Sequence, residues 1–336
     1  MWLRELWFVL VGILFTGYFI LDGFDYGVGM LHPFINRTDT ERRASLSAIG
    51  PIWSANEVWL VAAGGALFAA FPIWYATMFS GFYLALILIL LGLIVRGVGI
   101  EYRSHDKSPK WRAMWDWLIF AGSFLVTALW GMAFANLIRG VPITRHKIYV
   151  GNFGTLFNSF SLWAALTFVL VFLVQGGSYL AIKGNPNSRR QGRRMASKMV
   201  WPAALVLAIW FIWMDRLPSA AGHVDTVVVL LQGLAVLSLL LGRIASYFTK
   251  YGIAFILSSV SIAATTLGQF RILFPRVMVS SINPHFSLTI YNASSVTYTL
   301  QIMSVTALII LPIILGYQTW LYWTFRKPVK DEEMGY

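Results

Sequence analysis

The sequence lacks cysteine and contains few charged residues. Without cysteine, the chain has no disulfide, no thiolate-bound iron–sulfur cluster and no cysteine-based zinc site. Charged residues make up 12% of its 336 residues, whereas ordinary soluble domains contain about 25%. Hydrophobic residues make up 58%. This composition predicts a polytopic membrane protein.

The formal net charge of +12 does not indicate a nucleic-acid partner. In a chain this apolar, basic residues belong mostly to cytoplasmic loops beside anionic lipid. The first residues, MWLRE, lead directly into a long apolar run with no small-residue cleavage pattern. We therefore expect this run to be retained as the first membrane helix.

Long apolar runs recur along the chain, and about 20 predominantly apolar residues cross a bilayer. The nine expected helices are residues 6–30, 52–74, 77–100, 115–138, 160–182, 199–214, 224–247, 252–274 and 296–325. Most of the 26 Lys and Arg residues follow helices 1, 3, 5 and 7 or lie in the C-terminal tail. This bias predicts an outer N-terminus and a cytoplasmic C-terminus.

The predicted architecture is all-α, with a single integral membrane domain over residues 1–336. It comprises a four-helix bundle (1–140), a second four-helix bundle (141–275), and an outer loop, ninth helix and cytoplasmic tail (276–336). The outer connections 139–159 and 275–295 share Asn, Ser, Gly and Pro, which hints at two related halves. The basic segment 183–198 is expected to be a cytoplasmic surface loop that anchors the topology, rather than a site for a phosphorylated partner.

The segment LDGFDYGVGM, residues 21–30, ends the first predicted span. Asp22 and Asp25 are three residues apart, so on a helix they point about 60° from each other. Gly23 and Gly27 lie on the neighbouring stripe and allow another helix to approach closely. An ionised carboxylate in a membrane costs roughly 2.5–3.5 kcal/mol on insertion scales. A compensating charge is therefore expected nearby.

The predicted topology gathers five ionisable residues in the cytoplasmic half of helices 1 to 3: Asp22, Asp25, Glu57, Arg96 and Glu101. Either Arg96 neutralises one carboxylate and the group only locks the helices together, or the group lines a proton path. The surplus of acids over one arginine slightly favours the proton path. Separately, the small-residue run containing Gly64 and Gly65 favours close packing, within the chain or against a partner.

The histidines do not favour a haem site in this chain. All five lie at span ends or in loops: His32, His105, His146, His223 and His285. A haem-binding helix needs its axial ligand within the span. Met132 and Met303 do lie in spans, but methionine more often fills space than binds metal. We therefore expect neither haem nor metal to be bound by this chain alone.

Several long strings closely resemble subunit II of bacterial cytochrome bd quinol oxidase. They are LDGFDYGVGML (21–31), TERR (40–43), NEVWLVAAGGALFAAFP (56–72), FSGFY (79–83), RGVGIEYRS (96–104), WRAMWDW (111–117), GNF (151–153) and SLTIYNASS (287–295). The resemblance runs from the first to the ninth predicted helix and is strongest over residues 20–155.

This resemblance implies a heterodimer in the bacterial cell membrane with a haem-bearing subunit I, often joined by a very small single-span subunit. The partner would hold the quinol site, two haems b and one haem d, where oxygen is reduced to water. Subunit II would act as a scaffold, and its helix 1 and 2 acids would help cytoplasmic protons reach the haems and so build a proton gradient. Asp25 matches the second Asp of the family's DGFD string and takes this role by resemblance.

The sequence departs from some relatives in the second helix. Those relatives have an acid where this chain has Ser54 and a Gln where it has Glu57. The proton-path role cannot be assigned to Ser54. Glu57 lies about one helical turn further along, so it has a suitable position to replace that acid.

Two other functions compete with the oxidase. A proton-coupled secondary transporter also suits about nine spans, intramembrane acids and possible repeats. Transporters often have spans broken near the midplane, but most prolines here lie near predicted span ends, with Pro312 the main exception. In the minimal alternative, the chain is a scaffold whose polar cluster conducts nothing. The resemblance favours the oxidase over the transporter.

Overall fold

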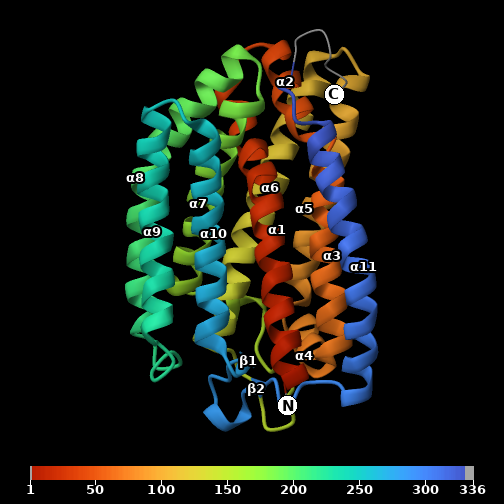
Figure 1. Ribbon diagram of the computed structural model, residues 1–336, viewed down its shortest axis with the longest axis vertical. Helices are drawn as coiled ribbons and strands as arrows, with labels where there is room; N and C mark the ends of the chain where they lie inside the picture. Colours follow the sequence, from red (N-terminus) through yellow and green to blue (C-terminus); the bar gives the residue numbers. More distant parts are fainter. Residues whose placement is uncertain (1, 330–336) are drawn as a thin grey trace.

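The computed structural model describes residues 2–329, which form a bundle of long helices (Figure 1). The α-helices are α1 (Trp2–Ile35), α2 (Asp39–Ile49), α3 (Trp53–Ala70), α4 (Pro72–Gly81), α5 (Tyr83–Tyr102), α6 (Pro109–Arg139), α7 (Ser159–Lys183), α8 (Pro186–Asp215), α9 (Thr226–Tyr247), α10 (Tyr251–Leu273) and α11 (Thr297–Thr324). In this part of the chain, 8 helices are long and apolar enough to cross a membrane, and the bent pair α2 and α3 brings the total to 9. The predicted all-α membrane fold is confirmed.

The basic segment 183–198 is not a surface loop, because α8 begins at Pro186. The side chain of Asn185 accepts a hydrogen bond from the backbone N–H of Ser188 at 2.9 Å, and Pro186 occupies the first helical position. The predicted start at residue 199 marked only where the helix becomes apolar. Arg and Lys are good helix formers, so the helix extends beyond the hydrophobic segment.

The boundaries predicted for the second and third spans are also wrong. α3 ends at Ala70, α4 is a separate short helix, and α5 begins only at Tyr83. Pro72 lacks a backbone N–H, so it suits the first position of α4 but not the interior of a continuous helix. Hydropathy alone did not reveal this break because the residues on both sides are apolar.

Helix α1 lies at the centre of the fold and packs against α3, α6, α7 and α10 (Figure 1). It therefore contacts helices from both predicted four-helix bundles, and the division of the chain at residues 140 and 275 remains a prediction. In the most apolar stretch of α7, 78% of the residues are buried, compared with 6% in α11. Most of the α11 surface thus faces outward.

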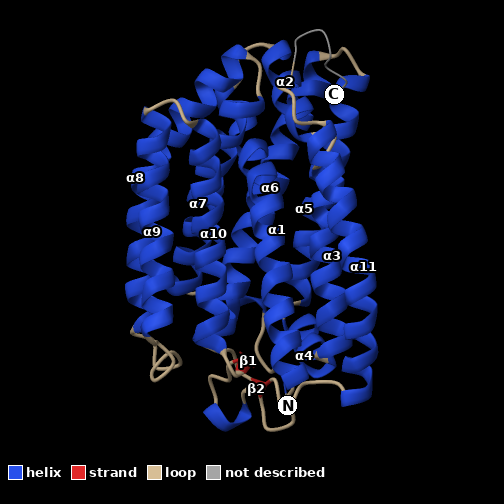
Figure 2. Cartoon of the chain, viewed as in Figure 1, coloured by secondary structure: helices blue, strands red, loops and turns tan. Residues whose placement is uncertain are grey.

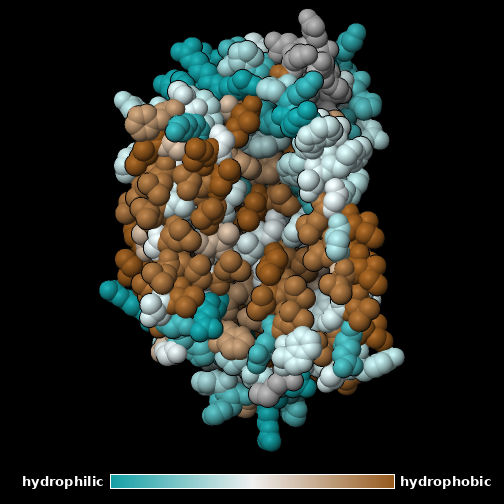
Figure 3. Space-filling model, in the orientation of Figure 1, coloured by the Kyte–Doolittle hydropathy of each residue, from teal (hydrophilic) through white to brown (hydrophobic). Residues whose placement is uncertain are grey.

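The two ends of the bundle are polar and the region between them is apolar (Figure 3). At the end where α1 begins, strand β1 (Arg276–Met278) pairs with β2 (Leu288–Thr289) in antiparallel fashion (Figure 2). Val141 forms a bridge with Ser280, which joins the two long connections. α11 ends at the opposite end from the start of α1, as an odd number of crossings requires (Figure 1). Which end faces the cytoplasm remains a prediction.

Candidate functional site

The two acids of the LDGFD string are fully buried in α1. Asp22 and Asp25 are both 0% exposed. The Oδ2 atom of Asp25 accepts a hydrogen bond from Asn56 Nδ2 on α3 at 2.8 Å. Asp25 Oδ1 and both carboxylate oxygens of Asp22 have no hydrogen-bond partner among the described residues. Such orphaned buried oxygens are costly, and intramembrane acids of this kind commonly mark functional sites.

One arginine, Arg96, lies among these acids. Arg96 on α5 is 0% exposed and donates a hydrogen bond through Nη1 to Glu57 Oε1 at 2.9 Å. Its guanidinium carbon lies 4.7 Å from the centre of the Tyr26 ring, in a cation–π contact. Asp22 interacts electrostatically with Glu57, Asp25 and Arg96. Three carboxylates from α1 and α3 thus lie around one guanidinium.

Glu101 does not join this cluster, contrary to the predicted gathering of five residues. It is exposed near the end of α5, where its Oε1 atom accepts a hydrogen bond from Trp53 Nε1 at 3.2 Å. Glu101 and Arg96 are five residues apart, which places them about 140° apart around the helix. The prediction considered depth in the membrane but not this rotation.

Asp25 is connected to α11 through side chains that sequence reasoning missed. Asn56 Oδ1 accepts hydrogen bonds from Tyr322 Oη at 2.8 Å and from Gln318 Nε2 at 3.4 Å. Gln318 Oε1 in turn accepts a hydrogen bond from Trp59 Nε1 at 2.6 Å. The available sequence signal was Gln318 itself, an amide within an apolar helix.

A second group of hydrogen bonds links the cluster to α6. The hydroxyls of Tyr18 and Tyr26 lie 2.5 Å apart, and both residues are 0% exposed. Trp130 Nε1 donates a hydrogen bond to Tyr18 Oη at 3.0 Å. Since the Tyr26 ring also contacts Arg96, the polar network extends from α6 through α1 to α5. The sequence analysis did not identify these residues.

Two of the four predicted packing glycines form a close helix contact. A Cβ atom on Gly27 would lie 2.0 Å from the carbonyl oxygen of Phe172 in α7, and one on Gly23 would lie 2.7 Å from Gln175 Oε1. By contrast, Gly64 and Gly65 have no heavy atom of another helix within 4 Å of the Cβ position in the described chain. Packing at these two glycines is therefore absent within residues 2–329, and packing against a partner remains a prediction.

A separate charged cluster lies at the end of the bundle opposite the N-terminus. Asp116 of α6 lies 2.5 Å from His32 Nε2, and it accepts hydrogen bonds from Arg103 Nε at 2.5 Å and Arg42 Nη1 at 2.6 Å. Arg103 also donates to Asp39 at 2.9 Å. This arrangement ties α1, α2 and α6 together and engages His32 with a carboxylate.

Within residues 2–329, no group of three or more His, Asp or Glu side chains is arranged to hold a metal ion. The fold and the site define a class: polytopic α-helical membrane proteins with a buried acid and arginine cluster inside the bundle.

Sequence comparisons identify the family within this class. The family model described as cytochrome bd terminal oxidase subunit II matches residues 3–325. The chain belongs to this family. It is 38% identical to cytochrome bd ubiquinol oxidase subunit 2 of Bacillus subtilis, over 98% of each chain. It is also 38% identical to cytochrome bd-I ubiquinol oxidase subunit 2 of Escherichia coli K12, over 99% of this chain and 96% of that one.

A solved structure confirms the fold. The bd oxidase from Geobacillus thermodenitrificans matches with a TM-score of 0.78 at 16% sequence identity, covering 96% of this chain and 99% of that chain. Family membership makes the chain a subunit of a quinol:oxygen oxidoreductase complex with a partner subunit I. It is a multi-pass protein of the bacterial plasma membrane.

Proposed function

We propose that this chain is the non-haem subunit of its oxidase, that it stabilises subunit I, and that it carries cytoplasmic protons through Asp25. The observation that supports this most strongly is the set of buried carboxylates around Arg96, with three carboxylate oxygens of Asp22 and Asp25 lacking a partner in the described chain. The two haems b, the haem d and the quinol site would belong to subunit I, where they supply the oxygen chemistry. A small single-span subunit would complete the complex.

The burial of the acids suggests an order for the path. The side chain of Glu57 is 21% exposed, whereas Asp22 and Asp25 are 0% exposed. Glu57 would exchange protons with a hydrated cavity at the edge of the bundle, and the two aspartates would hold them inside. Glu101, at the exposed end of α5, would collect protons at the entrance. Because one guanidinium cannot neutralise three carboxylates, the cluster has capacity for exchangeable protons.

The face formed by α3 and α11 is our proposed docking surface for subunit I. Only 6% of the residues in the most apolar stretch of α11 are buried, and the small residues Ala62 and Ala66 of α3 line the surface beside it. An apolar groove of about 410 Å³ lies between α1, α3 and α11. A large exposed face with small residues is typical of a helix-packing interface in a membrane. The hydrogen-bonded Gln318 and Trp59 lie on these same two helices.

The proton-path proposal is tested with Asp25→Asn and Glu57→Gln in the assembled oxidase, with Asp106→Asn as the exposed control. We expect each of the first two variants to reduce oxygen consumption and proton uptake about tenfold or more, since positioned proton transfer groups contribute at least this much. Haem content and complex yield should stay unchanged.

The three variants separate the possible outcomes. If Glu57→Gln matches the control while Asp25→Asn is impaired, the role of Glu57 is refuted and that of Asp25 stands. If both variants match Asp106→Asn with intact haem content, the cluster is only a structural lock.

A proton-coupled transporter remains the alternative function, and the 44° bend between α2 and α3 is compatible with it. α8 continues through Pro202 and α11 through Pro312, so these two spans lack the breaks typical of transporter binding sites.

A further inference from the structure

An arginine-lined hollow lies between α8 and α9, at the end of the bundle opposite the N-terminus. Its volume is about 450 Å³. Four arginines, two serines and one tyrosine line it: Arg190, Arg193, Arg194, Ser197, Arg243, Ser246 and Tyr247. We call this the arginine hollow.

The sequence spacing explains why these side chains converge. Arg190, Arg194 and Ser197 are separated by four and three residues, so they lie along one face of α8. Arg243 and Ser246 have the same relation on α9. Both walls of the arginine hollow therefore carry positive charge, with hydroxyl groups between the guanidinium groups.

No carboxylate neutralises these charges in residues 2–329. None of the four arginines of the hollow forms an ion pair there, whereas Arg96, Arg103 and Arg271 each do. The chain has no Asp or Glu between residues 117 and 214 or between 226 and 330. Like charges held this close repel one another unless an anion lies between them. The arginine hollow thus lacks a negative partner from the described chain.

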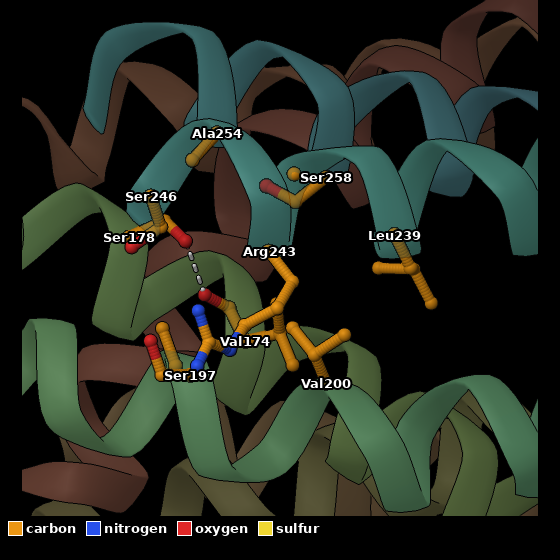
Figure 4. Close-up of a pocket in the computed structure, with 11 residues that line it drawn as sticks. Val174, Ser178, Ser197, Val200, Leu239, Arg243, Ser246, Ala254 and Ser258 are labelled. Carbon is orange, nitrogen blue, oxygen red and sulfur yellow. Dashed lines mark hydrogen bonds between the residues drawn. The ribbon is translucent and has the colours of Figure 1, made fainter. Parts of the chain in front are cut away.

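Arg243 occupies the inner wall of the hollow. Its Nε atom is buried and has no hydrogen-bond partner in the described chain. Figure 4 shows its side chain reaching from α9 toward Ser197 on α8. On the outer wall, Arg193 is held by Tyr251, whose hydroxyl accepts a hydrogen bond from Nη1 at 2.7 Å. A guanidinium with free donors is well suited to bind a phosphate.

The surface beside the arginine hollow is apolar and faces outward. On α8, Trp201 and Leu205 continue the stripe of Arg194 and Ser197 and are 63% and 62% exposed. On α9, Leu240 lies three residues before Arg243 on the same face and is partly exposed. Figure 3 shows the apolar band that crosses this side of the molecule. A ligand with a phosphate at one end and hydrocarbon chains at the other matches both parts of this surface.

We propose that the arginine hollow binds the phosphate headgroup of an anionic phospholipid, with its acyl chains lying along α8 and α9. Free phosphate shares the headgroup chemistry, but it would leave the adjoining apolar wall unused. This site is distinct from the acid cluster at Asp25, so it does not depend on the proton path.

The test measures lipid binding to the delipidated oxidase complex in detergent by native mass spectrometry. The probes are phosphatidylglycerol, phosphatidylcholine and inorganic phosphate. The variant Arg190→Gln/Arg194→Gln/Arg243→Gln removes three charges from the hollow. The control Arg37→Gln/Lys107→Gln/Lys110→Gln removes three exposed charges elsewhere on the chain.

We expect the hollow variant to bind phosphatidylglycerol at least about tenfold more weakly than the wild type, since losing a hydrogen bond to a charged group typically has this effect. The control should bind it like the wild type. Phosphatidylcholine should bind weakly and equally to all three proteins. If the triple variant does not assemble, single Arg194→Gln is compared with Lys110→Gln, and a several-fold loss in the former alone is expected.

Two results would overturn the proposal. An equal loss in the hollow variant and the control would mean that binding follows the general surface charge. Inorganic phosphate that binds the wild type as tightly as the lipid and displaces it would identify a free-phosphate site instead.

Discussion

Asp116 offers a strong test of what holds the charged end of the bundle together. It is 1% exposed and engages His32, Arg42 and Arg103 at 2.5–2.6 Å. Substitution by alanine would remove the acceptor shared by these three side chains without adding bulk. The resulting loss of stability depends on which of them can reach water.

Arg103 determines how much stability the Asp116→Ala variant should lose. It is 1% exposed, and its remaining carboxylate partner is Asp39. Removing one partner of a buried ion pair typically costs 3–5 kcal/mol because the other charge stays buried, so we expect Asp116→Ala to destabilise the chain by about that amount. Arg42 is 29% exposed and can turn to solvent. Asp116→Asn keeps a neutral acceptor, and we expect a smaller loss, about 1.5–3 kcal/mol.

The assay is the fraction of purified protein that stays monodisperse after heating, with Asp106→Asn as the control at an exposed carboxylate. Exposed charges typically contribute about 0–1 kcal/mol, so the control should resemble the wild type. The temperature at which half of the protein is lost should be highest for the control, lower for Asp116→Asn and lowest for Asp116→Ala. If all three temperatures coincided, Asp116 would not stabilise this end of the bundle, and the argument from burial would be refuted.

Two further predictions concern helix packing and the loop between α8 and α9. Gly27→Ala would place a Cβ atom 2.0 Å from the carbonyl oxygen of Phe172, so we expect the protein to lose about 1–3 kcal/mol of stability in the same heating assay. Gly64→Ala, whose Cβ atom would lie in open space, should change stability by less than about 0.5 kcal/mol. Equal losses in the two variants would contradict the α1–α7 contact. Burial, and then the nearby Arg276 charge, lower the pKa of His223. The folded loop therefore disfavours the protonated imidazole. The stability of the loop should fall as the pH drops below about 6.5, where His223 of the unfolded loop becomes protonated. Amide exchange of residues 216–225, corrected for intrinsic rates, should therefore quicken at acidic pH in the wild type but not in His223→Gln, and an unchanged pH dependence in the variant would refute this role.

The sequence predicted the number of spans because hydropathy and length determine which segments can cross a membrane. It did not predict the exact helix ends. The break at Pro72 lies within apolar sequence, and the start of α8 at Pro186 lies within polar sequence. In both places local capping and backbone hydrogen bonding decide the boundary, and hydropathy does not detect them.

The candidate site was predictable only in part. Asp22, Asp25, Glu57 and Arg96 could be grouped by depth, but Glu101 lies on another face of α5. The contribution of α11 was harder to foresee, since Tyr322 contacts Asn56 across 266 residues of sequence. Such a contact depends on how α11 packs against α3, and that packing leaves no periodic signal in a helix whose surface is mostly exposed.

The two buried charge clusters contain the same chemical group in opposite hydrogen-bonding situations. Asp116 is surrounded by donors and binds three of them, so its carboxylate is satisfied by the protein itself. Asp22 is equally buried but accepts no hydrogen bond within residues 2–329. A buried polar group without a partner calls for an explanation, and the proposed proton path supplies one for Asp22, whereas Asp116 needs none.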